Sequence, residues 1–432
     1  MHLSRRARSI AAAAVAAALA LGLTACGQGG AANPSLTSKG PITVWYSNNE
    51  QEVTWGKQMV AAWNAQHPDQ RVTAQEIPAG RTSEAVISAA ITAGNAPCLV
   101  LNTAPFAVGQ FEKQGGLVDL SKFPDGNAYI EGRSGDLAKQ YRSAVDGDYY
   151  QLPWKSNPVV IFYNKKAFAK AGIDTKDPGL NTYAGFLAAA RKVVKAGAAK
   201  VAIQPAPTNE FYQLDFDFYP LYVAASDGTP LIQDHRATFA DATGDRVADL
   251  WRTLYREGLA SPEQYQGDAF ADGYSAMAIV GPWAVSYYKD VDWAAVPVPT
   301  PNGVPADEIH TFSDAKNIGM FTACQHKGTA WDVLKFATSK AQDEKFLDIT
   351  GQMPIRPDLE TTFAGYFAKH PEYRLFGSLA GRTVEVPSGP NTVQEMQTFR
   401  NEWTSSVIFG GKRPAQALDD AAATIDTLEK QP

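Results

Sequence analysis

Residues 41–77, PITVWYSNNEQEVTWGKQMVAAWNAQHPDQRVTAQEI, contain a complete strand–helix–strand pattern. The β-branched and aromatic run from Ile42 to Tyr46 predicts a strand, and Val72 to Ile77 predicts the next one. Between them, residues 52–66 place large apolar side chains at helical spacing, and Pro68 stops the helix. A unit of this kind places two parallel strands side by side with the helix on one face of the sheet.

The same alternation continues toward the C-terminus. Residues 81–93 predict a helix, 99–102 a strand and 104–114 a further helix, so we expect an α/β fold with a parallel sheet. Later segments with the same patterns predict helices at 166–171, 183–195, 237–257, 329–339, from 342 onward, 393–407 and 415–428, and strands at 274–280 and 318–322.

Three apolar segments are interrupted by proline. They are residues 152–163, 296–305 and 353–357. Proline cannot donate a ladder hydrogen bond, so such runs favour edge strands or segments that cross between domains. We interpret them as three crossings.

The N-terminus has the pattern of an export signal. Arg5, Arg6 and Arg8 precede an apolar run from Ile10 to Leu23, which is shorter than the ~20 residues that span a bilayer. The run ends in Leu-Thr-Ala-Cys26, which looks like a bacterial lipobox, whereas the alternative is an ordinary secretory signal with an incidental cysteine. We favour cleavage before Cys26 and lipidation of its thiol. This predicts a signal at 1–25, a flexible tether at 26–40 and a protein anchored by lipid at the extracytoplasmic face of the cell membrane.

The composition and net charge of the chain restrict the classes of molecule that it can bind. The 432 residues are 45% hydrophobic and 19% charged, which is typical of a globular chain, and are long enough for two or three domains. A net charge of −6 argues against nucleic acid, because phosphate binding needs a basic face. Cys98 and Cys324 could form a disulfide outside the cell, but spacing alone leaves this open, and two buried unpaired thiols are the preferred interpretation.

Six sets of short segments occur in a characteristic order along the chain. They are Ile42 to Tyr46, Ala93 to Pro97, Leu152-Pro153 through Ile161 to Phe168 with Ala171 to Ile173, Asp272 to Met277 with Gly281-Pro282-Trp283, Ala330 to Ser339, and Pro354 to Arg356. In this order they resemble the extracellular solute-binding proteins of bacterial ABC importers, most closely those that bind sugars. In one respect the chain departs from that family, since Cys98 stands where an aspartate is usual after Ala96-Pro97.

The resemblance implies a periplasmic-binding-protein-like fold, in which two α/β lobes are joined by crossing segments and a ligand binds in the cleft between them. We expect an N-terminal lobe of residues 41–157 plus 310–353 and a C-terminal lobe of 158–309 plus 354–432. It further implies a monomer without cofactor or metal that captures a sugar for an ABC permease. Disaccharides, amino sugars and glycerophosphodiesters remain open as ligands.

Candidate binding residues in the N-terminal lobe follow its predicted strands. Asn48, Asn49 and Glu50 follow the first strand, where one of them also suits a helix cap. Arg81 begins the next helix, and a cation there opposes the helix dipole, which hints at an anionic or polar neighbour. Asn102 ends the third strand at the expected edge of the cleft.

The remaining candidates lie at the crossings and in the C-terminal lobe. Sugars need aromatic faces for their C–H surfaces and polar groups for their hydroxyls. The resemblance assigns sugar stacking to Trp283, with a core tryptophan as the alternative. It places Trp154 at the border of the cleft, where hinge packing explains it equally well. The other candidates are Asn157, the aromatic and acidic pair Tyr212 and Asp215, and the two guanidinium groups of Arg356 and Arg382, one of which we expect in an ion pair.

Two other functions stay open at this level. An enzyme acting on extracellular glycans would need two carboxylates across a cleft, and no acid pair stands out. The six histidines show no His-x-x-x-His pattern and the chain has no Gly-x-Ser-x-Gly elbow, so we expect no catalytic residue. A sensory sugar-binding lipoprotein would have the same sequence features as a transport protein.

Overall fold

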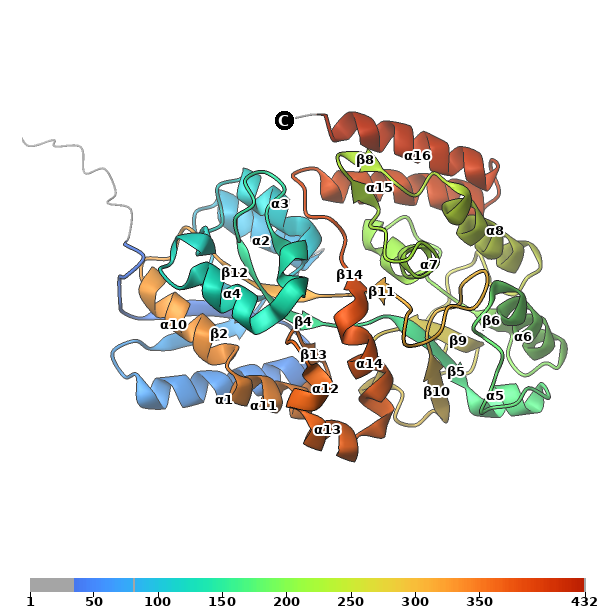
Figure 1. The fold of residues 1–432 in the computed structure, drawn as a ribbon, viewed down its shortest axis with the longest axis horizontal. Coiled ribbons are helices and arrows are strands. Elements are labelled where there is room, and N and C mark those ends of the chain that lie inside the picture. The colour runs from blue at the N-terminus through green and yellow to red at the C-terminus, as the bar shows by residue number, and fades with distance from the viewer. Residues whose placement is uncertain (1–34, 81, 431–432) are drawn as a thin grey trace, which may run out of the picture.

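The computed structural model describes residues 35–80 and 82–430, which fold into two sheets covered by helices (Figure 1). The predicted signal, Cys26 and most of the tether lie outside the described residues, as does Arg81. Cleavage and lipidation therefore stay predictions. Within the described ranges, no helix is long and apolar enough to cross a membrane.

The first sheet has six strands in the order β13-β4-β12-β3-β1-β2. β1 pairs in parallel with β2 and β3, as the alternation predicts. β12 runs antiparallel to β3 and β4, and β13 antiparallel to β4, so the parallel strands predicted from the alternation form only part of a mixed sheet. Only a strand reached through a covering helix must be parallel to its neighbour, and β12 is entered from the second lobe. The strands are β1 (Ile42–Tyr46), β2 (Val72–Glu76), β3 (Leu99–Thr103), β4 (Gln151–Ser156), β12 (Lys316–Met320) and β13 (Met353–Pro354).

Helices cover both faces of this sheet because successive side chains of each strand point to opposite faces. In β3, Leu99 and Leu101 share a core with α1, α4, α10 and α11, whereas Val100 packs in the core that contains α2 and α3. These helices are α1 (Glu50–Gln66), α2 (Ser83–Thr92), α3 (Pro105–Lys113), α4 (Gly126–Ser134), α10 (Lys327–Ala337) and α11 (Lys340–Thr350).

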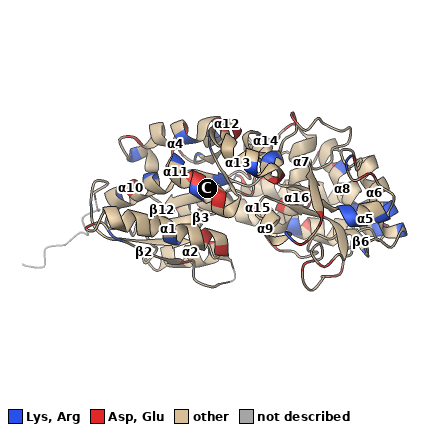
Figure 2. Cartoon of the chain, turned by 90° about the horizontal axis from the view of Figure 1, so that it is seen from below, with Lys and Arg blue, Asp and Glu red and all other residues tan. Residues whose placement is uncertain are grey.

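The second sheet has four strands in the order β10-β5-β9-β6, namely β5 (Val160–Asn164), β6 (Val201–Ile203), β9 (Ser275–Val280) and β10 (Trp293–Val296). Basic residues gather on α5 and α6 at one end of this lobe (Figure 2). The remaining helices are α5 (Lys165–Lys170), α6 (Tyr183–Lys195), α7 (Tyr219–Ala225), α8 (Ala242–Arg256), α9 (Ala284–Tyr287), α12 (Leu359–Thr362), α13 (Ala364–Lys369), α14 (Arg374–Leu379), α15 (Thr392–Trp403) and α16 (Pro414–Leu428). Two short sheets pair β7 (Ile232–Gln233) with β8 (Arg236–Ala237), and β11 (Thr311–Phe312) with β14 (Thr383–Val384).

The first predicted crossing is confirmed, because β4 lies in the first sheet and β5 in the second. The second crossing is misplaced: Thr300 bridges Thr182 within the second lobe, and the chain returns at Ser313, which bridges Pro158 of the first crossing. Prolines mark where regular pairing stops, and this need not be where the chain changes lobe. The predicted α/β fold of two lobes is confirmed, while the domain boundaries stay a prediction.

A disulfide joins Cys98 and Cys324. The preferred interpretation of two unpaired thiols is therefore wrong. Cys98 directly precedes β3 and Cys324 follows β12, and the pairing of these neighbouring strands brings the two Cα atoms to 4.5 Å. Sequence spacing carries no information about this approach, because 226 residues separate the two cysteines.

Candidate ligand-binding site

A cavity of about 330 Å³ lies where the two lobes meet the returning crossing. The first lobe contributes residues of α2 and α3, and the second lobe contributes the 3₁₀ helix η3 (Phe211–Phe216). We call this cavity the cleft. It is lined by Thr82, Glu84, Phe106, Tyr212, Asp215, Phe216, Asp314 and Lys316.

Aromatic packing positions η3 against the first lobe. Phe106 of α3 meets Phe211 edge to face with ring centroids 5.4 Å apart, and Phe211 meets Tyr212 in the same way at 5.6 Å. Leu214 of η3 is fully buried. This arrangement leaves Tyr212 partly exposed and aims Asp215 at the cleft.

Asp215 is the most unusual group in the cleft. It is only 3% exposed, and its Oδ1 has no hydrogen-bond partner among the described residues. Burial and then the nearby Asp314 raise the pKa of its carboxyl well above the ordinary value, although Lys316 acts in the opposite direction. The Lys316 ammonium already pairs with Asp314 at 2.5 Å. A carboxyl in this state lacks a partner that a ligand could supply.

A second cavity of about 420 Å³ adjoins the cleft and shares Phe216 with it. Trp283 lines this cavity and meets Phe216 edge to face at 6.1 Å. The Tyr288 hydroxyl donates to Asp268 at 3.0 Å on the same wall. Further aromatic and amide side chains in the lining are Gln204, Gln213, Gln264, Tyr265 and Phe270. Ring faces beside amide groups match the apolar face and hydroxyl rim of a sugar.

The turn before α9 exposes Trp283. A Cβ added at Gly281 would lie 2.0 Å from the Trp283 ring, so only glycine permits this close approach. Trp283 directly precedes α9 as its N-cap residue instead of continuing β9. Of the twelve predicted binding residues, the structure brings Tyr212, Asp215 and Trp283 into these two cavities.

The polar residues after β1 divide between capping and contact with the second lobe. Asn49 caps α1, since its Oδ1 accepts from the backbone N–H groups of Gln51 and Glu52. Its Nδ2 also donates to the Tyr287 hydroxyl at 2.8 Å, across the gap between the lobes. Asn48 and Glu50 are exposed nearby.

The crossing residues are buried in this structure. Trp154 is 1% exposed and packs against Trp55 and Phe346, as the hinge-packing alternative describes. Asn157 donates to the Asp314 carbonyl and to the side chain of Gln352. Neither lines a described cavity that contains Trp283 or Asp215.

Asn102 is half-buried near the end of β3 and does not line the cleft. Arg81 lies outside the described residues, but Thr82 and Glu84, which follow it, line the cleft. The helix start that was predicted around Arg81 therefore lines the cleft. A contact between Arg81 and the ligand stays a prediction.

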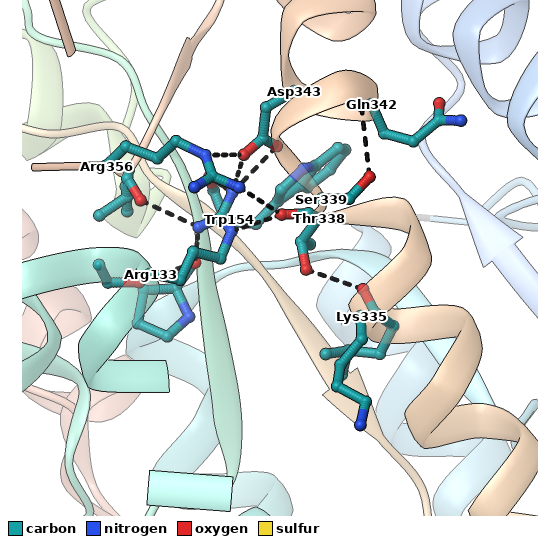
Figure 3. A network of polar contacts seen from close by, with 12 residues as sticks. Arg133, Trp154, Lys335, Thr338, Ser339, Gln342, Asp343 and Arg356 are labelled. Atoms are coloured by element: carbon teal, nitrogen blue, oxygen red, sulfur yellow. Dashed lines mark hydrogen bonds and ion pairs between the residues drawn. The ribbon is translucent and has the colours of Figure 1, made fainter. Parts of the chain in front are cut away.

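Arg356 and Arg382 line a different cavity, of about 900 Å³. Arg356 donates to Asp343 at 2.5 Å and to the Thr338 carbonyl, in a network that Arg133 shares (Figure 3). Arg382 donates to the backbone carbonyls of Ile309 and Ala306. Both guanidinium groups already have acceptors within the protein, so the structure does not bring them to the cleft.

Sequence reasoning missed several residues of the cleft, notably Phe106, Asp314 and Lys316. One sequence signal could have indicated Asp314 and Lys316. The mostly polar run from Ser313 to Lys316 lies between apolar residues, and Ser313 is where the chain returns to the first lobe. No group of metal-ligating side chains occurs within residues 35–80 and 82–430.

Two α/β lobes that enclose a polar and aromatic cleft define the class of two-lobed solute-binding proteins. Residues 58–374 match the family of bacterial extracellular solute-binding proteins, and the chain belongs to that family.

Relatives within this class are distant. The maltodextrin-binding protein MdxE of Bacillus subtilis is 25% identical over an alignment of 351 residues that covers 77% of this chain and 77% of MdxE. Two solved structures share the fold with a TM-score of 0.76 and 91% of this chain covered. One is an uncharacterized protein of Listeria monocytogenes, at 24% identity and with its whole chain covered. The other is the cyclic alpha-maltosyl-1,6-maltose binding protein of Arthrobacter globiformis, at 19% identity and 99% covered.

Proposed function

We propose that this chain is a lipid-anchored substrate-binding protein, which captures a sugar or sugar-like solute outside the cell membrane and delivers it to an ABC importer. The observation that carries the proposal is the pair of adjoining cavities that share Phe216, one with a buried carboxyl and the other with Trp283 and amide side chains. The names of relatives that bind maltodextrin and a cyclic maltosyl-maltose support a sugar.

In this proposal the predicted lobes, 41–157 plus 310–353 and 158–309 plus 354–432, close around the ligand. The hydrogen bond from Asn49 to Tyr287 would be one of the contacts that lock the closed state. The closed pair of lobes would present the docking surface for the permease.

Thermal shifts of the purified protein against neutral sugars, amino sugars and glycerophosphodiesters test this function. A true ligand at ~100 times its Kd should add about 2.7 kcal/mol of stability. Turnover of a bound glycan would favour an enzyme instead, and capture of a sensor rather than a permease would favour the sensory alternative. No shift with any sugar would refute the proposal.

Trp283→Ala is expected to weaken sugar binding by at least tenfold, because the ring face that packs on the ligand is lost. Its effect on stability should be small, since Trp283 is only partly buried and borders a cavity. Calorimetric titration measures the affinity, and Trp45→Ala, another partly buried tryptophan outside both cavities, is the control. Unchanged affinity in Trp283→Ala would rule out the stacking role.

A further inference from the structure

The second lobe carries a local excess of positive charge that the net charge of the chain hides. Residues 165–200 contain eight Lys and Arg against two acids, Asp174 and Asp177, a balance of +6, whereas the whole chain is −6. Subtracting +6 from −6 leaves −12 for the rest of the chain. The segment forms α5, α6 and the turns that follow them, and its basic groups gather at one end of the second lobe (Figure 2).

Most of these basic side chains are exposed and lack an acidic partner. Lys165 pairs with Asp292, and Arg191 pairs with Glu257, which neutralises two of the eight. The other six are exposed and form no ion pair with a described residue, and we call them the basic face. They are Lys166, Lys170, Lys176, Lys192, Lys195 and Lys200.

Helix stability accounts for only part of the basic face. Lys170, Lys192 and Lys195 lie in the last turns of α5 and α6, where a cation suits the helix dipole. Lys166 lies in the first turn of α5, where the dipole opposes it, and it repels Lys170 one turn further along. Lys166 therefore costs the fold some stability, which a partner of opposite charge would offset.

The chemistry of the basic face suits an extended anionic surface better than one small anion. None of the three cavities described above includes any of its lysines. An ammonium is a point charge on a flexible stem, whereas bidentate binding of a single phosphate or carboxylate needs the guanidinium fork of arginine. Lysines spread over two helices attract many phosphate groups at once, as the headgroups of anionic lipids present them.

The opposite end of the molecule is fixed to the segment that leads to the predicted lipid. The Ser38 carbonyl accepts from the N–H of Gly328 at 3.0 Å, and the N–H of Gly40 donates to Thr329 at 3.1 Å, so the predicted tether ends on α10. The twelve residues from Cys26 to Ser38 reach about 40 Å at most. A lipid at Cys26 would thus keep the first lobe near the membrane, while α5 and α6 lie at the other end of the long axis (Figure 1).

We propose that the basic face binds the anionic lipid surface of the membrane to which the protein is anchored, an inference that rests on the lipid anchoring in the proposed function. The lipid holds the first lobe and the basic face holds the second, so the long axis of the molecule lies along the membrane. Charges more than a Debye length of about 8 Å from the headgroups are screened, and the acidic remainder of the chain therefore does not prevent this contact.

Energy transfer in the protein purified from membranes and placed on vesicles tests this orientation. A donor attached at Ala188→Cys, an exposed position of α6, labels one thiol, because Cys98 and Cys324 are paired and Cys26 is predicted to carry lipid. Acceptors are placed on headgroups of phosphatidylcholine vesicles with or without phosphatidylglycerol. Transfer should at least double in the anionic vesicles and return to the neutral level in about 1 M salt, where the Debye length falls to about 3 Å.

Two sets of four charge reversals give a matched comparison. The rise in transfer should disappear when the basic face is reversed by Lys166→Glu, Lys192→Glu, Lys195→Glu and Lys200→Glu. It should persist when exposed lysines of α1, α11 and α13 are reversed by Lys57→Glu, Lys340→Glu, Lys345→Glu and Lys369→Glu. Both sets change the net charge equally. Thermal unfolding checks that each variant is folded, and sugar affinity should be unchanged in both sets.

The outcomes separate this inference from the proposed function. Equal transfer to both kinds of vesicle, or an equal loss in the two sets of variants, would overturn the inference and leave sugar binding and anchoring intact. Tighter binding of the basic face to soluble polyphosphate than to the vesicles would assign it to a polymer and also overturn the inference.

The mass of the purified protein tests the anchor separately. A mass without lipid on Cys26 would remove the anchor from the proposed function. The wild-type protein should then still sediment with phosphatidylglycerol vesicles, and the variant with the reversed basic face should not. Failure of the wild-type protein to sediment would show that the basic face does not bind the membrane.

Discussion

Replacing Cys98 and Cys324 together by serine is expected to lower the free energy of unfolding by about 5 kcal/mol, the value that chain entropy gives for a closed loop of this length. The two cysteines are 226 residues apart, and the loop between them contains every strand of the second sheet. The disulfide joins the residue before β3 to the segment after β12, so it closes a loop that contains the whole second sheet.

Denaturant unfolding with and without a reducing agent measures this effect. The wild-type protein in reductant should lose as much stability as the double variant, and the double variant should not respond to reductant. Equal stability of the wild-type protein under both conditions would show that the disulfide does not stabilise the fold. Alkylation of the unfolded, unreduced protein, followed by mass measurement, provides the control that Cys98 and Cys324 are paired.

Asp343→Ala is expected to lower the free energy of unfolding by about 3–5 kcal/mol, the usual cost of removing one partner from a buried ion pair. Asp343 is fully buried and accepts from both Arg133 and Arg356 (Figure 3). Arg133 also donates to the backbone carbonyls of Pro153, Trp154, Thr338 and Ile355. The network thereby joins α4, β4, the end of α10 and the chain just after β13.

The shift of the unfolding midpoint in denaturant gives the size of this effect. Asp332→Ala is the matched control, because Asp332 pairs with Lys39 at the surface and such pairs contribute about 0–1 kcal/mol. A loss in Asp343→Ala no larger than that of the control would show that the network is not a structural support. Sugar affinity should survive in the folded fraction of Asp343→Ala, since Asp343 does not line the cleft.

Much of the fold could be predicted because it depends on neighbours within a few residues. Helix α6 begins and ends at the predicted residues, Tyr183 and Lys195, since its apolar spacing and the capping Thr182 are local features. Asn49 caps α1 for the same reason. The direction of β12 could not be predicted, because it depends on how the chain returns from a lobe more than a hundred residues long.

The candidate site was predicted only in part. The aromatic and acidic run that became η3 was recognisable, and so was the Gly-Pro-Trp turn that exposes Trp283. Arg356 has the chemistry of a ligand contact, but a long and flexible side chain binds whichever acceptor packing brings within reach, and here that is Asp343. Trp154 suits a sugar equally well, yet Trp55 and Phe346 cover it.

The sequence by itself determined the α/β class, most helix and strand positions, the resemblance to solute-binding proteins and the predicted export signal, because periodicity, capping and short motifs are encoded locally. Only the tertiary structure decided that Cys98 meets Cys324, that Phe106 packs on Phe211 to position η3, and that Oδ1 of the buried Asp215 has no hydrogen-bond partner among the described residues. These features depend on which distant segments pack together, and burial, which sets the energy of each charge, exists only after that packing.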